Sequence, residues 1–131
     1  MFPYREIYTF AKNIEAMKRI FDVDFLPKAA VFLETLDEKT REKVYYNIRK
    51  SQVIQDNELF KKLNELIWEF RTLFNNKSYR LLAFWDNTEG QTALVIATHG
   101  ILKKSQKTPQ KEIEKAEEIR KQYLKSKINK K

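Results

Sequence analysis

Three lysines lie close together in the C-terminal third of the chain, where an apolar run ends. Lys103, Lys104 and Lys107 follow shortly after the only histidine, His99. A dense group of cations at the end of a strand suits a polyanion better than it suits a hydrophobic core. The sequence therefore predicts an exposed, phosphate-binding surface at this point of the chain.

Two arginines on earlier segments have the chemistry to join those lysines. Arg71 and Arg80 carry planar guanidinium groups that hold phosphate oxygens through paired hydrogen bonds. Lysine is normally too basic for proton transfer at neutral pH, with a pKa of about 10.4, but crowding among other cations lowers that value. His99 titrates near neutrality and can act as an acid or a base, so the individual proton-transfer roles stay open. The candidate catalytic residues are Arg71, Arg80, His99, Lys103, Lys104 and Lys107.

Each of these residues also has a purely structural interpretation. Arg71 can pair with Glu69 or Glu65, and His99 can be a histidine with satisfied hydrogen bonds at a strand end. The lysines can form a solvated edge, which is the usual place for charged side chains. Arg80 is a stronger candidate than Arg71, because it faces out of an otherwise apolar strand, and the density of the lysines before a capped helix favours phosphate binding by them.

The composition limits the class of protein. A chain of 131 residues with 42% hydrophobic residues supports one domain with a real core. The absence of cysteine excludes disulfides and cysteine-bound zinc, and with one histidine we expect no metal and no cofactor. The net charge is +8, and residues 100–131 hold eleven Lys/Arg against four Glu, so an acidic partner should bind there. No signal peptide or membrane span is recognisable, which favours a cytoplasmic protein.

The first part of the chain predicts a strand followed by two helices. Residues 19–25 alternate as in a half-buried strand. Helical spacing begins at Pro27 and again after Asp37, which can cap the second helix. A short link joins the two helices, so we expect an antiparallel helix hairpin with Leu33 and Val44 buried against the sheet.

The second part of the chain predicts a sheet and a final helix. Residues 56–66 fit one helical turn plus a loop, and the spacing of apolar residues then changes to that of strands. Thr108 can cap, and Pro109 can open, a C-terminal helix. The expected strands, which form an antiparallel three-strand meander, cover residues 67–73, 78–85 and 91–102.

Two segments resemble one protein family. WEFRTLFNNKSYRLLAFWD, from Trp68 to Asp86, and THGILKKSQKTPQKEIEKA, from Thr98 to Ala116, are similar to the phage-derived, HigB-like branch of the RelE/ParE toxin superfamily. The resemblance implies an α+β, RelE-like fold over residues 19–124. Residues 1–18 are then an N-terminal extension, and residues 125–131 are a basic tail that we expect to fray.

The resemblance also implies an activity and partners. Such toxins are metal-independent endonucleases that cut messenger RNA on the ribosome, and a cognate antitoxin, usually a helix-turn-helix protein from the adjacent gene, inhibits them. Two alternatives stay open. One is a ParE-like toxin that inhibits DNA gyrase, and the other is a catalytically inactive toxin fold that serves only as a binding module.

Overall fold

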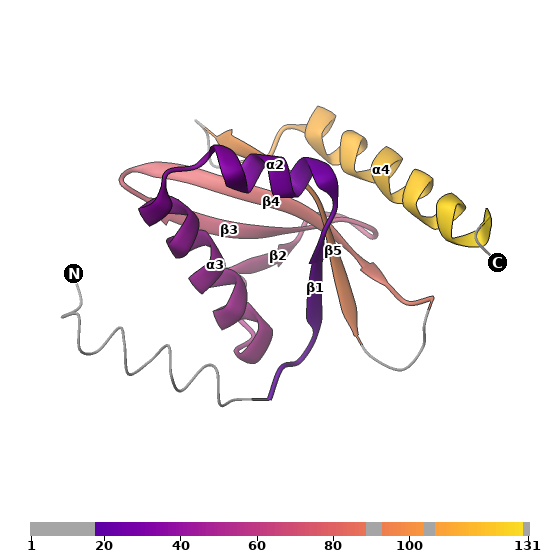
Figure 1. Cartoon of the computed structure of the whole chain (residues 1–131), viewed down its shortest axis with the longest axis horizontal. Coiled ribbons are helices and arrows are strands. Elements are labelled where there is room, and N and C mark those ends of the chain that lie inside the picture. The colour runs from indigo at the N-terminus through magenta and orange to yellow at the C-terminus, as the bar shows by residue number, and fades with distance from the viewer. Residues whose placement is uncertain (1–17, 89–92, 104–106, 130–131) are drawn as a thin grey trace.

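The protein is a five-stranded sheet with helices on both faces (Figure 1). The computed structural model describes residues 18–88, 93–103 and 107–129. The predicted α+β class is confirmed. Lys104 and nearly all of the expected N-terminal extension lie outside the described residues. The elements are β1 (Asp22–Phe25), α2 (Pro27–Thr35), α3 (Glu38–Val53), β2 (Phe60–Lys62), β3 (Trp68–Phe74), β4 (Lys77–Asp86), β5 (Leu94–Lys103) and α4 (Gln110–Asn129).

The strand order is β1-β5-β4-β3-β2, and its centre is the expected antiparallel meander of β3, β4 and β5. The edges differ from the prediction. β1 pairs parallel with β5, which the long connection through α2, α3 and three strands permits, so the sheet is mixed rather than wholly antiparallel. β2 pairs with β3 in the segment that we interpreted as a turn and a loop, where leucines at helical spacing concealed a strand of three residues.

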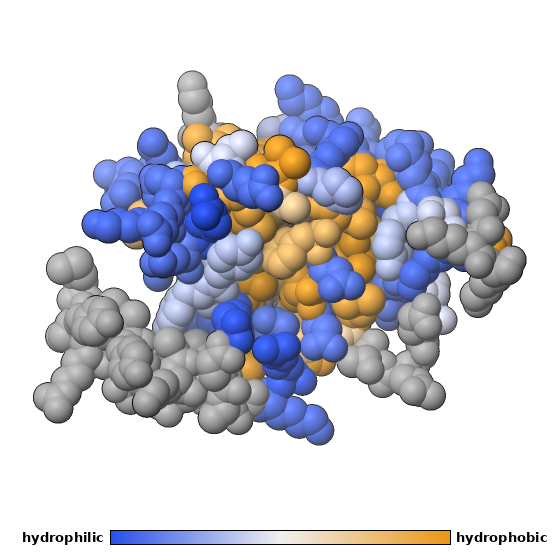
Figure 2. All heavy atoms as spheres, viewed as in Figure 1, coloured by the Kyte–Doolittle hydropathy of each residue, from blue (hydrophilic) through white to orange (hydrophobic). Residues whose placement is uncertain are grey.

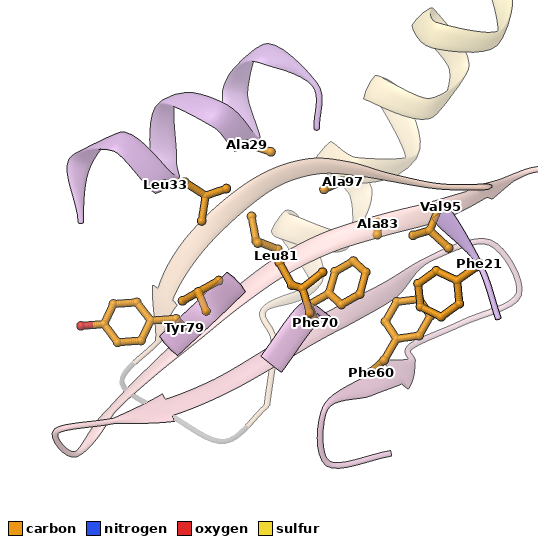
Figure 3. Close-up of a cluster of buried hydrophobic side chains, with 12 residues drawn as sticks. Phe21, Ala29, Leu33, Phe60, Phe70, Tyr79, Leu81, Ala83, Val95 and Ala97 are labelled. Atoms are coloured by element: carbon orange, nitrogen blue, oxygen red, sulfur yellow. The ribbon is translucent and has the colours of Figure 1, made fainter. Parts of the chain in front are cut away.

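The two N-terminal helices cover one face of the sheet, and they diverge from their short link so that α2 lies on β5 and α3 on β3 (Figure 1). Asp37 caps α3 as predicted, because its side chain accepts a hydrogen bond of 2.8 Å from the Thr40 amide. Leu33 and Val44 are buried as expected, whereas Tyr45, the next residue of α3, is 40% exposed. Figure 3 shows this core, in which the rings of Phe21, Phe60 and Phe70 gather beneath Ala83 of β4 and Val95 of β5; Phe21 directly precedes β1.

One glycine brings α2 close to the sheet. A Cβ atom on Gly100 would lie 2.1 Å from the ring of Phe32, so only glycine allows the Phe32 ring to lie against β5. On this side of the molecule, Figure 2 shows apolar residues gathered in the middle of the face, over α2 and β1, with hydrophilic residues around them.

Helix α4 covers the other face of the sheet through Ile113 and Ala116, which pack on buried residues of β4 and β5. We expected the chain to fray from residue 125 onward, and this is wrong up to Asn129, because α4 continues to that residue. Lys127 explains the difference, since its ammonium group lies 2.7 Å from the buried carboxylate of Asp86.

Candidate functional site

A tight turn sets the two candidate arginines opposite each other. Asn75 and Asn76 both adopt positive φ angles, 52° and 61°, as a two-residue hairpin turn requires. The register that results pairs Arg71 of β3 with Arg80 of β4. Residues directly opposite in a sheet share a face, so both guanidinium groups lie on the face that α4 covers.

A β-bulge brings the end of β5 to the same face. Leu82 pairs with His99 but Ala83 pairs with Ala97, so Thr98 is an extra residue in β5. With strict alternation, Lys103 would lie on the same face as Ala97, which is the face that α2 and α3 cover. The bulge reverses this, and Lys103 therefore lies on the same face as the two arginines.

These cations surround one carboxylate, in a group that we call the Glu69 cluster. Its members are Glu69, Arg71, Arg80, Lys103 and Thr108. Glu69 Oε2 lies 3.6 Å from Nε of Arg71 and 3.6 Å from Nε of Arg80. The Thr108 hydroxyl donates a hydrogen bond to Glu69 Oε1 and accepts one of 3.4 Å from Lys103. Glu69, Arg80 and Lys103 are only 2%, 5% and 7% exposed, so much of the surface predicted from the sequence is in fact interior.

Arg71 and Arg80 each have an Nε donor that makes no hydrogen bond with the described residues. A separation of 3.6 Å is too long for a hydrogen bond. The buried Nε atoms of Arg71 and Arg80 have no hydrogen-bond partner within the described parts of the chain. Arg71 also donates a long bond of 3.4 Å to the Asn57 carbonyl. Glu69 therefore balances charge without using these Nε donors.

Burial and mutual repulsion alter the acidity of the cluster. Burial lowers the pKa of Lys103, and the charge of Arg80 lowers it further. Burial also lowers the pKa of Arg80, although a guanidinium stays charged at neutral pH. The shift for Lys103 has the direction that proton transfer near neutral pH requires, as its position among cations predicted.

His99 belongs to a different set of contacts. Its Nε2 lies 3.3 Å from Oε1 of Glu112 but, like the two arginine Nε atoms, makes no hydrogen bond with the described residues, and its Nδ1 lies 3.0 Å from the hydroxyl of Thr98. Burial lowers its pKa and Lys115 adds to this, while Glu112 opposes both. His99 and Glu69 stand on the same face but are separated by β4, about 10 Å at ordinary strand spacing. The structure thus places His99 beside the Glu69 cluster rather than in it.

The other two lysines, and the residues that contact the candidate site residues, can also be compared with their predictions from the sequence. Lys107 is exposed, and Lys104 lies outside the described residues. Sequence reasoning treated Glu69 only as a partner for Arg71, expected Thr108 to cap α4, and gave Glu112 no role. Thr108 instead binds Glu69, and the Pro109 carbonyl accepts the first hydrogen bond of α4. The signal that could have found Glu69 was its position two residues from Arg71, on the same strand face.

A second buried carboxylate lies under the far part of α4, in a group that we call the Asp86 cluster. Its hydrogen bonds come from the Thr88 amide (2.9 Å), the Thr88 hydroxyl (2.6 Å), the Tyr123 hydroxyl (2.5 Å) and the Lys127 ammonium (2.7 Å). Burial opposes ionisation of Asp86, but these donors outweigh it and hold the pKa of the carboxyl well below its usual range. Across the described ranges, no three His, Asp or Glu side chains gather as a metal site would require.

The family model described as "Phage derived protein Gp49-like (DUF891)" matches residues 31–121, more than half of the chain and all of the Glu69 cluster. The chain belongs to the Gp49-like family. This family is part of the RelE/HigB-type toxin group, and membership in it implies an antitoxin as a partner. No curated protein matches the sequence closely enough to count as a relative. None of the helices described has an apolar stretch of the length that a membrane crossing needs.

Proposed function

We propose that this Gp49-like protein is the toxin of a toxin–antitoxin pair and that it cuts messenger RNA on the ribosome without a metal ion. The observation that carries the proposal is the Glu69 cluster, in which three cations from three strands converge and two guanidinium groups keep unused donors. Such an arrangement suits a phosphate group whose negative charge increases during reaction.

The reaction that fits is attack by the 2′-hydroxyl of RNA on the adjacent phosphorus. The 2′-oxygen loses its proton and bonds to phosphorus, the bond from phosphorus to the 5′-oxygen breaks, and the 5′-oxygen takes up a proton. Arg71 and Arg80 would hold the phosphate oxygens, because two planar forks opposite each other can bind several oxygens together. Lys103, whose pKa burial and Arg80 lower, is the group in this cluster best suited to proton transfer.

The other candidates take supporting places in this proposal. Lys107 is exposed next to the cluster and would attract the RNA backbone by charge alone. Lys104 is expected to do the same, as predicted from the sequence. His99 lies beside Glu112 and Thr98, outside the Glu69 cluster, so the proposal does not depend on it.

The antitoxin partner would neutralise this basic surface. We propose a helix-turn-helix protein from the adjacent gene, with acidic residues facing the C-terminal part of the chain. The interaction should then weaken as salt concentration rises, because exposed charge pairs are screened over about 8–10 Å at physiological ionic strength. An affinity independent of salt would contradict this part of the proposal.

The test is expression of the wild-type chain and of Arg80→Lys in growing cells that lack the partner. We expect growth arrest and new message ends, mapped by primer extension on translated messages, with the wild type only. A gyrase supercoiling assay with the purified protein separates the ParE-like alternative, which would inhibit gyrase and leave messages intact. Absence of growth arrest with folded wild-type protein would favour the inactive binding module and overturn the proposal.

A further inference from the structure

Glu69 is a buried, charged member of the Glu69 cluster, and it has no role in the reaction proposed above. The carboxylate lies between the Nε atoms of Arg71 and Arg80, at 3.6 Å from each, and the Thr108 hydroxyl donates to its other oxygen. These are the same groups that a bound phosphate would contact, so Glu69 stands where the phosphate is needed.

The carboxylate fits this position incompletely. It supplies negative charge, but at 3.6 Å it leaves both buried Nε donors without a hydrogen bond among the described residues. A buried donor without a partner is costly. A phosphodiester also has two charged oxygens, but they are held on a tetrahedral phosphorus with two ester oxygens, so its acceptors point in more directions than those of a planar carboxylate and can reach donors on both sides of it. The cluster is therefore better matched to a phosphate than to the carboxylate that it holds.

We propose that Glu69 occupies the place of an RNA phosphodiester in the free protein, and that the phosphodiester displaces the Glu69 carboxylate from the two arginines when it binds. The identification of the anion as RNA rests on the function proposed above, whereas the anion site itself rests only on the geometry of the cluster.

Displacement of Glu69 also opens the site. Thr108 lies directly before α4 and is held by Glu69 on one side and by Lys103 on the other. Arg80 is 5% exposed, so an incoming phosphate needs groups around it to move. When Glu69 leaves the arginines, its bond to Thr108 breaks, and the Thr108 hydroxyl keeps only its bond to Lys103 among those described. Binding of the anion and release of Thr108 from Glu69 are then one event.

The first experiment measures thermal stability with and without inorganic phosphate, at equal ionic strength with chloride as the reference. Glu69→Gln keeps the shape of the side chain but removes the charge that balances three cations, so its melting temperature in chloride should fall by several degrees. Phosphate should restore much of that loss. The dissociation constant obtained from the phosphate dependence should be about tenfold lower for Glu69→Gln than for the wild type, a usual size for removal of one neighbouring like charge.

Asp86→Asn is the matched control, because it also removes a buried carboxylate that a lysine contacts under α4. Its melting temperature should fall as well, but phosphate should not restore it, since the Asp86 cluster has one lysine and no arginine among its members. An equal gain from phosphate in the two variants would overturn the proposal, because phosphate would then be acting on the whole protein.

Thr108→Val is a second variant in case Glu69→Gln does not fold. It keeps Glu69 and the size of the side chain but removes the hydroxyl that holds the carboxylate, so phosphate should bind several-fold more tightly than to the wild type. An unchanged phosphate affinity would overturn the proposal. The same titration with a 2′-O-methyl RNA trinucleotide, which cannot be cut, tests the phosphodiester. A toxin that cuts messages but shows none of these shifts would refute only this inference, and a chain that shows them without toxicity would refute only the proposed function.

Discussion

The Glu69 cluster and the Asp86 cluster both contain a buried carboxylate, hydroxyl groups or cations, but they differ in how many hydrogen bonds the carboxylate accepts and how many cations surround it. Each places a strand carboxylate in the interior beneath α4 and attaches it to a group from that helix or from just before it. Asp86 accepts four hydrogen bonds, two on each oxygen, and pairs with one lysine. Glu69 has one described hydrogen bond and faces three cations, two of which keep a buried donor unpaired.

This difference separates a structural charge from a binding site. A buried carboxylate whose oxygens are all engaged has nothing left to offer a ligand, and it serves to fix α4 on the sheet. A carboxylate that balances charge but leaves the donors around it unsatisfied marks a place where another anion can improve the fit. Burial alone would not have distinguished Glu69 from Asp86, because both are almost completely inaccessible to solvent.

The largest effect should come from Arg80→Lys. The substitution keeps the charge beside Glu69 but loses the planar fork that can hold two phosphate oxygens. We expect message cleavage to fall by about 10²–10³, the range for removal of one group that stabilises charge in the transition state. Primer extension and the melting temperature should be measured together, because Arg80 is buried and a variant that unfolds is uninformative. Full cleavage by a folded Arg80→Lys protein would show that the Glu69 cluster does not hold the phosphate.

The next largest effect concerns stability rather than activity. Asp86→Asn should lower the free energy of unfolding by about 1–3 kcal/mol, because the Lys127 ammonium and the Tyr123 hydroxyl lose their charged acceptor. Cleavage below the melting temperature should stay unchanged. A variant that keeps its stability but loses cleavage would assign the Asp86 cluster to the active site.

The same variant should change the response to acid. Because the pKa of Asp86 is lower in the folded than in the unfolded chain, its stabilisation is complete well above pH 4 and is lost as the pH falls through about 4 toward the folded value. Unfolding curves at a series of pH values should therefore show a steeper acid decline for the wild type than for Asp86→Asn. Parallel declines would mean that the carboxylate is not held as its hydrogen bonds indicate.

Much of the fold follows from the sequence, because alternation, capping residues and the Asn75-Asn76 turn are local signals. The turn even sets Arg71 opposite Arg80. The β2 strand was missed because its three residues are held by pairing with β3 rather than by their own spacing. Whether β1 would pair parallel or antiparallel depends on a neighbour about seventy residues away in the chain, and no local pattern encodes it.

The residue types of the candidate site could be predicted from the sequence, but the burial of those residues could not. The bulge at Thr98 decides which face of the sheet Lys103 occupies. A bulge of one residue cannot be recognised in the sequence of a mostly apolar strand. The interior position of Arg80 also depends on neighbours that only the folded sheet brings to it, such as Glu69 of β3 at 3.6 Å. Charged residues are usually on the surface, and that expectation misplaced this one.

The His99 contacts allow a test of how far the site extends. His99→Gln should reduce cleavage by no more than about tenfold, well below the loss for a general acid or base, because His99 contacts Glu112 and Thr98 outside the Glu69 cluster. Its lowered pKa means that the folded protein favours neutral His99, so this contribution to stability is present above about pH 6.5 and is lost as the pH falls below it. His99→Gln should remove that part of the decline. If His99→Gln lost as much cleavage activity as Arg80→Lys, His99 would have to take part in proton transfer.

The smallest effect should come from Lys107→Ala, which tests the exposed margin of the Glu69 cluster. Lys107 is exposed, so its removal should change the free energy of unfolding by no more than about 0.5 kcal/mol, as is usual for surface substitutions. If it contacts the RNA backbone by charge, binding of a 2′-O-methyl oligonucleotide should weaken similarly for every sequence. The slope of log affinity against log salt should then decrease by about 0.7, the value for one phosphate of a single strand. Lys107→Arg is the control and should bind as the wild type does, whereas Arg80→Lys should not, because Lys107 acts through charge and Arg80 through geometry. An unchanged salt slope for Lys107→Ala would confine RNA contact to the interior cations, and the approach of the backbone would then have to follow another surface.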